Sequence, residues 1–151
     1  MTMTDTEWGL PDPDTHAEFY ADVTSKRLIA FVIDTILIII LTILIIPFTA
    51  FIGLFFIGFL GLLVNLTYRT LTLAAKSATP GMRVMAIEFR NKDGERLGLG
   101  TAFVHSALFA ISMSMVAPQL VSILLMLTSR RGQGLSDFLL GTAAINKVST
   151  Y

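Results

Sequence analysis

Long apolar stretches without any charged residue dominate this chain, the first over residues 35–68 and the second over residues 97–129. A helix needs about 20 apolar residues to cross the hydrocarbon core of a bilayer. The first stretch and its flank therefore predict two crossings. Pro47 cannot donate a backbone hydrogen bond and disfavours helix in the residue before it, so we place the turn there. The pattern predicts membrane-spanning helices over residues 28–46 and 51–70.

The second stretch is too interrupted to predict one simple crossing. Pro118 divides it into residues 101–116 and 118–128, which as helices would reach about 24 Å and about 17 Å, short of the ~30 Å hydrocarbon core. A single crossing over residues 101–128 would also place the basic residues that follow it on the outer face, against the positive-inside rule. We expect a broken, re-entrant or tilted helical pair that returns the C-terminus to the cytoplasm. A single tilted third helix is the alternative.

Between the two stretches lies a polar segment with strand character. Apolar and polar residues alternate from Val84 to Arg90, Asp93-Gly94 is a strong turn signal, and Leu97 and Leu99 could form the apolar face of a return strand. This pattern predicts a small cytoplasmic β-hairpin over residues 84–99. The whole chain is therefore predicted to be an all-α membrane protein with one small hairpin.

The C-terminal segment predicts one short helix and one strand. Ser136 or Asp137 could cap a helix that reaches Leu140, with Gly141 just past its end. Residues 142–148 could form a third strand beside the hairpin, if the C-terminus lies on the same side of the membrane.

Composition supports the membrane interpretation and excludes several other classes. Apolar residues make up 54% of the chain and charged residues 15%, and the mean hydropathy is +0.72. So few charges could not cover the surface of a soluble globule, so lipid must cover much of it. A soluble enzyme, a disordered chain and a nucleic-acid binder are excluded. The chain contains no cysteine. A disulfide scaffold, a thiolate zinc site and an iron–sulfur protein are therefore excluded as well.

Charge is distributed unevenly along the chain. The first 22 residues contain six acidic residues and neither lysine nor arginine, which predicts a disordered acidic tail over residues 1–23 ahead of a membrane domain over residues 24–148. The tail is unlike the basic start of a cleavable signal peptide. Lys26 and Arg27 precede the first helix, and further basic residues follow the second. The positive-inside rule then places the N-terminus in the cytoplasm.

Asp34 is the first candidate for chemistry because it lies inside the hydrocarbon, about 10 Å along the helix from Arg27. An ionisable residue at that depth costs ~2.5–3.5 kcal/mol on insertion scales and is usually paired or turned toward a cavity. The position of Asp34 therefore predicts one of two roles: a site that binds a proton or cation, or a structural bond between helices. Arg27 lies two turns earlier on nearly the same face, so we expect both residues in one network.

Three further polar residues lie in the apolar stretches or at their ends. Asn65 and Arg69 are four residues apart, so they share a helix face; we expect Asn65 to join helices and Arg69 to anchor at the interface. His105 is more typical of a hydrogen-bonded core residue than of a ligand. No nucleophile–base pair and no metal-ligand spacing is present in the sequence, so we predict no enzyme, no catalytic residue, no metal and no cofactor.

Three motifs in this order resemble the RDD family of small bacterial membrane proteins: KRLIAFVID at residues 26–34, TPGMR at 79–83 and QGLSDFLLGT at 133–142. The family is named for one arginine and two aspartates, which Arg27, Asp34 and Asp137 match. The resemblance covers about residues 24–148. The chain departs from the usual family pattern at two positions, Met82 and Ser136.

The resemblance implies a protein of the bacterial inner membrane that is suspected of transport, with cation/proton antiport proposed for some members. It implies a network of Arg27, Asp34 and Asp137, to which we add the supporting residues Asn65, Arg69, Thr79, Gly81, Arg83 and His105. One hypothesis is a small transporter or antiporter-type subunit that uses Asp34. The other is a structural or accessory subunit of a larger membrane complex. Two full crossings cannot enclose a path alone, so we expect a homo-oligomer or a larger complex in the bilayer, without nucleic acid.

Overall fold

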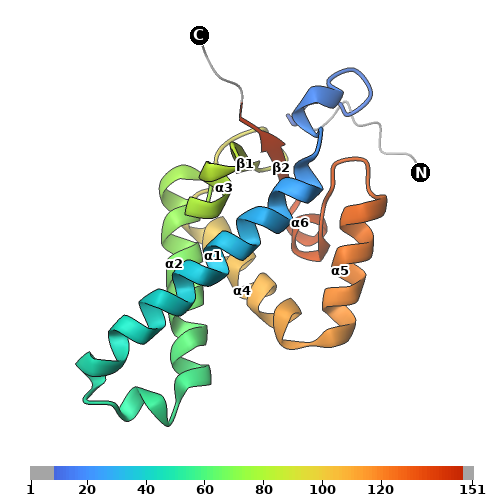
Figure 1. The fold of residues 1–151 in the computed structure, drawn as a ribbon. Coiled ribbons are helices and arrows are strands. Elements are labelled where there is room, and N and C mark those ends of the chain that lie inside the picture. Colours follow the sequence, from blue (N-terminus) through green and yellow to red (C-terminus); the bar gives the residue numbers. More distant parts are fainter. Residues whose placement is uncertain (1–8, 148–151) are drawn as a thin grey trace.

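Helices make up most of the computed structural model, which describes residues 9–147. The helices and strands, labelled in Figure 1, are α1 (Val23–Ile45), α2 (Ile57–Lys76), α3 (Pro80–Val84), β1 (Ile87–Arg90), α4 (Leu99–Ser114), α5 (Val116–Thr128), α6 (Leu135–Leu140) and β2 (Ala143–Asn146).

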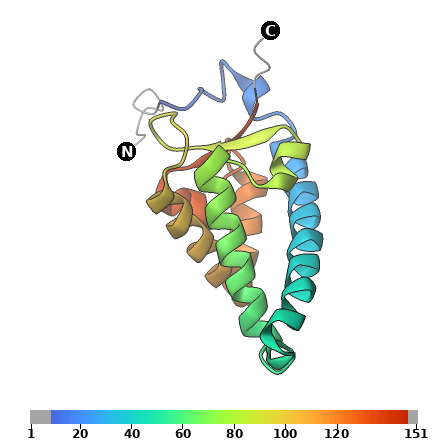
Figure 2. The ribbon, with the colours of Figure 1, turned by 90° about the vertical axis from the view of Figure 1, so that its left-hand side faces the viewer.

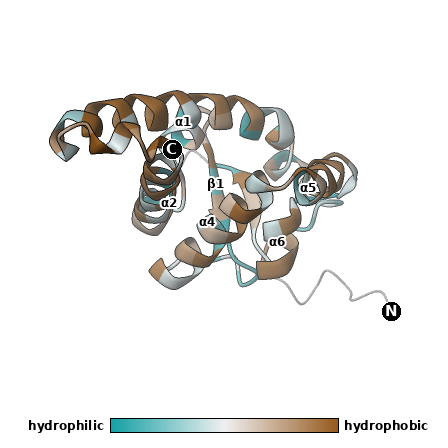
Figure 3. Cartoon of the chain, turned by 90° about the horizontal axis from the view of Figure 1, so that it is seen from below, coloured by the Kyte–Doolittle hydropathy of each residue, from teal (hydrophilic) through white to brown (hydrophobic). Residues whose placement is uncertain are grey.

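The helices α1 and α2 are both long and apolar enough to cross a membrane. They contain 23 and 20 residues, which at 1.5 Å per residue is about 35 Å and about 30 Å, the thickness of the hydrocarbon core. This confirms the prediction of two helices that are long and apolar enough to cross a membrane. Figure 3 shows that apolar residues cover most of the length of α1.

The connection between α1 and α2 is longer than the predicted turn at Pro47. Two short 3₁₀ helices, Ile46–Thr49 and Ile52–Leu54, follow α1. Between them the chain reverses at Ala50 and Phe51, whose φ angles of 53° and 64° lie in the left-handed region. The second helix therefore begins six residues later than predicted.

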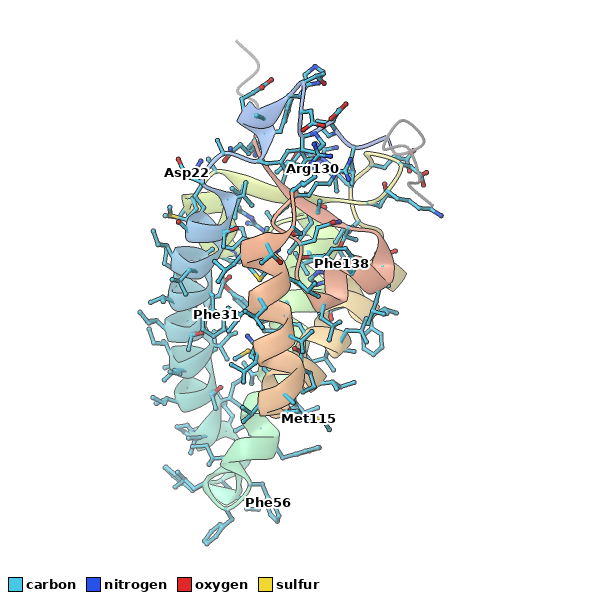
Figure 4. All side chains as sticks on the ribbon, turned by 90° about the vertical axis from the view of Figure 1, so that its right-hand side faces the viewer. Asp22, Phe31, Phe56, Met115, Arg130 and Phe138 are labelled. Atoms are coloured by element: carbon cyan, nitrogen blue, oxygen red, sulfur yellow. The ribbon has the colours of Figure 1, made fainter. Side chains whose placement is uncertain are left out.

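The second apolar stretch forms a broken helical pair, as predicted. The helices α4 and α5 meet at Met115 and are bent by 116°. Pro118 does not make the break. It lies in the first turn of α5, where its missing N–H has no helical partner to lose. In Figure 4 Met115 lies well short of the level of Phe56, so the pair turns back before the far end of the spanning helices.

The two strands form a small antiparallel sheet, but the predicted hairpin over residues 84–99 is wrong. Strand β1 pairs with β2, with Phe89 opposite Ala144. The other edge of β1 is occupied by Ser77, whose carbonyl accepts from the Phe89 amide at 2.7 Å and whose hydroxyl donates to the Phe89 carbonyl at 2.6 Å. The predicted second strand of the hairpin therefore cannot pair with this edge of β1. The Leu97 amide instead donates to the Ser77 hydroxyl at 3.0 Å, and the chain continues into α4.

Helix α3 was not predicted, although the sequence carries a start signal for it. Thr79 accepts a hydrogen bond from the Met82 amide at 3.3 Å, and Pro80 occupies the first helical position. The predicted C-terminal helix and strand are both present as α6 and β2. Gly141 ends α6 with φ of 70°. Residues 1–8 of the predicted tail and residue 148 of the predicted strand lie outside the described residues.

The molecule has two distinct ends. At one end the sheet covers a core of buried apolar side chains that includes Val23, Leu73 and Phe89, and the described chain both begins and finishes there (Figures 1 and 2). At the other end Phe48 and Phe55 are 90% and 86% exposed. The core therefore lies under the sheet, and most of the apolar surface lies along the spanning helices. The alternative of a single straight third helix over residues 101–128 is not what the structure shows, because α4 and α5 are bent by 116°.

Residues 9–22 lie over the sheet end. The Gly9 amide donates to the Lys92 carbonyl at 2.7 Å, and the Asn146 amide group donates to the carbonyls of Glu18 and Ala21, both at 2.8 Å. These bonds connect the segment before α1 to the loop after β1 and to the last strand, β2.

Candidate functional site

Asp137 is the centre of a buried cluster that joins four segments of the chain. Its Oδ1 accepts hydrogen bonds from His105 Nε2 at 2.9 Å and from Thr142 Oγ1 at 2.8 Å. Its Oδ2 accepts from Arg27 Nη1 at 2.7 Å and from the Gly134 amide at 3.0 Å. The bond from Gly134 caps the start of α6. The cluster thus fixes α6 to the beginning of α1 and to the middle of α4.

The charge of Asp137 is set by its neighbours. Burial works to raise the pKa of this carboxyl, but the Arg27 guanidinium, the hydrogen bond from His105 and the Gly134 amide outweigh it and hold the pKa well below its usual range. Asp137 and Arg27 therefore form a permanent buried ion pair, and this aspartate is unsuited to exchanging a proton.

Asp34 is the centre of a second buried cluster, in which no cation of residues 9–147 donates a hydrogen bond to it. Its Oδ1 accepts from the Tyr68 hydroxyl and from the Gly81 amide, both at 2.8 Å, and its Oδ2 accepts from Thr79 Oγ1 at 2.5 Å. These bonds join α1 to α2 and α3. Glycine is required at position 81, because a Cβ atom there would lie 2.3 Å from the Ala30 carbonyl oxygen.

The predicted single network of Arg27, Asp34 and Asp137 is thus divided into two. Arg27 and Asp137 form one ion pair, whereas Asp34 bonds only to neutral donors. The two clusters still share a neighbourhood, because Arg27 and Asp34 both line the same cavity.

This cavity has a volume of about 410 Å³ and lies between α1, α2, α4 and α5. Its wall is mainly apolar, and Figure 4 shows Phe31 of α1 on the side where α1 and α5 face each other. Three charged residues line it: Arg27, Asp34 and Arg69. Met82 and Ser136, the two departures from the usual RDD pattern, line it too.

Arg69 was expected to be an anchor at the membrane interface, but the structure buries it inside the protein. It is 6% exposed, and its guanidinium carbon lies 3.9 Å from the centre of the Phe109 ring on α4. Its Nε atom is buried without a hydrogen-bond partner in the described part of the chain. Asn65, one turn earlier, also has a buried side-chain oxygen without a partner among those residues, so its predicted role in joining helices is not seen there.

The remaining predicted residues occupy different places. Thr79 and Gly81 belong to the Asp34 cluster, and His105 to the Asp137 cluster. Arg83 is exposed, donates to the Ala78 carbonyl at 3.3 Å and does not line the cavity. Among residues 9–147 no three side chains of histidine, aspartate or glutamate lie close enough together to hold a metal ion.

Two site residues were missed by the sequence analysis. Tyr68 lies next to Arg69 near the end of α2, and its position as a polar residue within the apolar stretch was a signal that was available. Thr142 closes the third motif and could have been found as a hydroxyl five residues after Asp137. Both are hydroxyl donors to a buried carboxylate.

Two helices long and apolar enough to span a membrane, together with a broken helical pair, are features typical of a membrane protein. The chain belongs to the RDD family, whose model matches residues 21–141, most of the chain. This confirms the resemblance found in the three motifs. Searches of curated proteins and of solved structures gave no match.

Proposed function

We propose that this protein is a small transporter or antiporter-type subunit of the bacterial inner membrane, and that Asp34 binds a proton or a monovalent cation in turn. The observation that carries the proposal is the position of Asp34. This buried carboxylate on a spanning helix lines a cavity and bonds only to neutral donors. Ionisable residues at membrane depth usually mark an ion or proton pathway.

The donors around Asp34 can accommodate a change in its charge. A proton on Oδ2 could be donated to Thr79, because a hydroxyl group can accept as well as donate a hydrogen bond. The Gly81 amide, which can only donate, bonds to the other oxygen and would keep its bond. A small cation could use the same oxygens, since the hydroxyls of Tyr68 and Thr79 can turn their lone pairs toward it.

The distribution of basic residues supports an orientation with both termini in the cytoplasm. Lys26 and Arg27 lie at the start of α1, and Lys76 and Arg83 lie at and after the end of α2, all near the sheet. The positive-inside rule places this end of the molecule in the cytoplasm. Two spanning helices cannot surround a path alone, so the working unit is a homo-oligomer or part of a larger complex.

Ion flux in proteoliposomes that contain only the purified protein tests the proposal. An internal pH dye reports proton movement when Na⁺, K⁺ or Li⁺ is added outside. We expect a cation-dependent pH change for the wild type, its loss in Asp34→Asn, and no effect of Glu95→Gln, an exposed carboxylate on the loop after β1. Absence of flux from correctly inserted wild-type protein, or wild-type flux from a well-folded Asp34→Asn variant, would overturn the proposal.

A second candidate function is that of a structural or accessory subunit. It is favoured by the clusters themselves, because Asp34 and Asp137 each join segments that are far apart in the sequence. If the clusters serve assembly alone, substitutions of Arg27, Asp34 and Asp137 should lower the yield of the complex together in membrane pull-downs. Intact assembly in all three variants would contradict this function.

A further inference from the structure

Arg69 is a buried cation that forms no direct ion pair with a carboxylate of the described residues. It is 6% exposed, its Nε atom has no hydrogen-bond partner, and no carboxylate of residues 9–147 forms an ion pair with it. Asp34 lines the same cavity and is the carboxylate that acts most strongly on Arg69 electrostatically, but the two side chains form no ion pair, and the hydrogen bonds to Asp34 come from three neutral groups. The ring of Phe109 stabilises one face of the guanidinium but provides no hydrogen-bond acceptor for its edge.

Arg27, the other arginine that lines the cavity, has hydrogen-bond acceptors for its guanidinium. Arg27 donates to Asp137 at 2.7 Å and to the Gly132 carbonyl at 3.0 Å, and its side chain is 14% exposed. A buried charge without such compensation is strongly unfavourable. Arg69 therefore calls for a negatively charged group from outside the described residues.

The cavity that Arg69 lines could hold a ligand with both an apolar part and a charged group. Its volume of about 410 Å³ is within the range of small-molecule sites. Most of the surface of the wall is apolar, with side chains such as Phe31, Phe109, Met113 and Ile123, although polar residues are interspersed along it. A free inorganic anion would leave most of this wall without a partner.

The mouth of the cavity lies on the outer surface of the helices. Leu28 on α1 and Leu127 on α5 both line the cavity, and they are 65% and 67% exposed. Close by, the Thr24 hydroxyl donates to the Met126 carbonyl at 3.3 Å and joins the two helices at the sheet end. In a membrane this opening faces the acyl chains of lipids, so a molecule could enter sideways from the bilayer.

We propose that the cavity binds an anionic amphiphile, that is, an acyl chain with a phosphate or carboxylate head, whose head pairs with Arg69. The acyl chain lies along the apolar wall and leaves between Leu28 and Leu127. An arginine is suited to such a head because its planar fork can donate two parallel hydrogen bonds to a phosphate or carboxylate. The inference uses the same cavity as the proposed function but requires no ion flux, so it stands or fails separately.

Equilibrium binding to the purified protein in a nonionic detergent tests this inference. Native mass spectrometry and thermal unfolding are measured with phosphatidylglycerol, oleate, phosphatidylcholine and inorganic phosphate as four separate probes. We expect saturable binding and a raised melting temperature with the two anionic amphiphiles, and neither effect with the zwitterionic lipid or with phosphate alone. Tighter binding of phosphatidylglycerol would indicate that the ligand is a bilayer lipid, and tighter binding of oleate would indicate a free fatty acid.

Three variants separate specific binding from general effects. Arg69→Met should weaken binding of the anionic probes at least tenfold and, because it removes an uncompensated charge, should raise the melting temperature of the lipid-free protein. Arg96→Met is the matched control at an exposed position and should bind like the wild type. Ile123→Trp fills the cavity without removing the charge and should also prevent binding.

Three results would overturn the inference. One is equal binding of phosphatidylglycerol and phosphatidylcholine, which would indicate non-specific contact with lipid. Another is unchanged binding in Arg69→Met. The third is inorganic phosphate binding as tightly as the amphiphiles, which would indicate a site for a free anion. Because no ion gradient exists in detergent, none of these results depends on the flux experiment.

Discussion

Asp137→Asn should be among the most destabilising conservative substitutions in this protein. The side chain is fully buried, and each of its oxygens accepts two hydrogen bonds. An asparagine would keep one acceptor oxygen and present an NH₂ group to the other two donors. If the oxygen stays with Arg27 and Gly134, the NH₂ group faces His105, whose Nδ1 is already buried without a partner among the described residues.

The expected loss in the free energy of unfolding follows from these contacts. Removing one partner of a buried ion pair typically destabilises by ~3–5 kcal/mol, because the remaining charge stays buried and uncompensated. Since asparagine keeps some of the hydrogen bonds, we expect a loss near the lower end, about 3 kcal/mol. An exposed ion pair, by contrast, contributes only about 0–1 kcal/mol.

Unfolding by SDS in mixed micelles, followed by circular dichroism, measures this loss. The matched control is Asp14→Asn, which removes the charge from the exposed ion pair with Arg130 and should change stability by less than about 1 kcal/mol. The double variant Arg27→Met, Asp137→Asn should be more stable than the sum of the two single losses predicts, because both changes break the same contact. Equal losses for Asp137→Asn and Asp14→Asn would refute the reasoning.

Three further predictions concern the two clusters. Gly81→Ala should lower the free energy of unfolding by ~1.5–3 kcal/mol, since the new Cβ atom would break the hydrogen bond from the backbone amide to the Asp34 carboxylate. The control Gly58→Ala, with open space around it, should not destabilise the protein in the same SDS assay. Because the pKa of Asp137 is lowered in the folded protein, its stabilisation is complete above about pH 5 and is lost as the pH falls toward the folded value. Melting temperatures between about pH 5 and 2 should therefore fall more steeply for the wild type than for Asp137→Asn. Tyr68→Phe removes one donor to Asp34 and should cost ~1.5–3 kcal/mol, and unchanged stability would show that this bond is not formed in the membrane.

The sequence predicted the elements whose formation depends on local composition. The two crossings follow from length and the absence of charge, and the broken pair follows from two helices that are each too short to span. The start of α2 was wrong by six residues because the chain reverses at Ala50 and Phe51, which carry no turn signal. The hairpin was wrong because Asp93-Gly94 fixes only a local turn, whereas Ser77 and β2 occupy both edges of β1.

The candidate site was predicted in its centres but not in its pairings. Arg27, Asp34 and Asp137 are the residues around which the two clusters form, and the helical spacing placed Arg27 and Asp34 toward one cavity. Their partners could not be predicted, because Arg27 and Asp137 are 110 positions apart and meet only through the complete fold. The burial of Arg69 was missed for the same reason, since Phe109 reaches it from α4.

The contrast between the donors of the two aspartates assigns different tasks to residues that the family motif treats alike. A permanent cation and an imidazole hold Asp137, so a loss of its charge would remove the anionic partner of the mostly buried Arg27 guanidinium. Only hydroxyl and amide groups hold Asp34, and two of these three donors can reverse their hydrogen bonds. A change in charge at the cavity is therefore far less costly at Asp34 than at Asp137. Under the proposed function, Asp137 holds α6 to α1 and α4, Asp34 is the exchangeable group in the cavity wall, and Arg69 is the cation that binds a ligand.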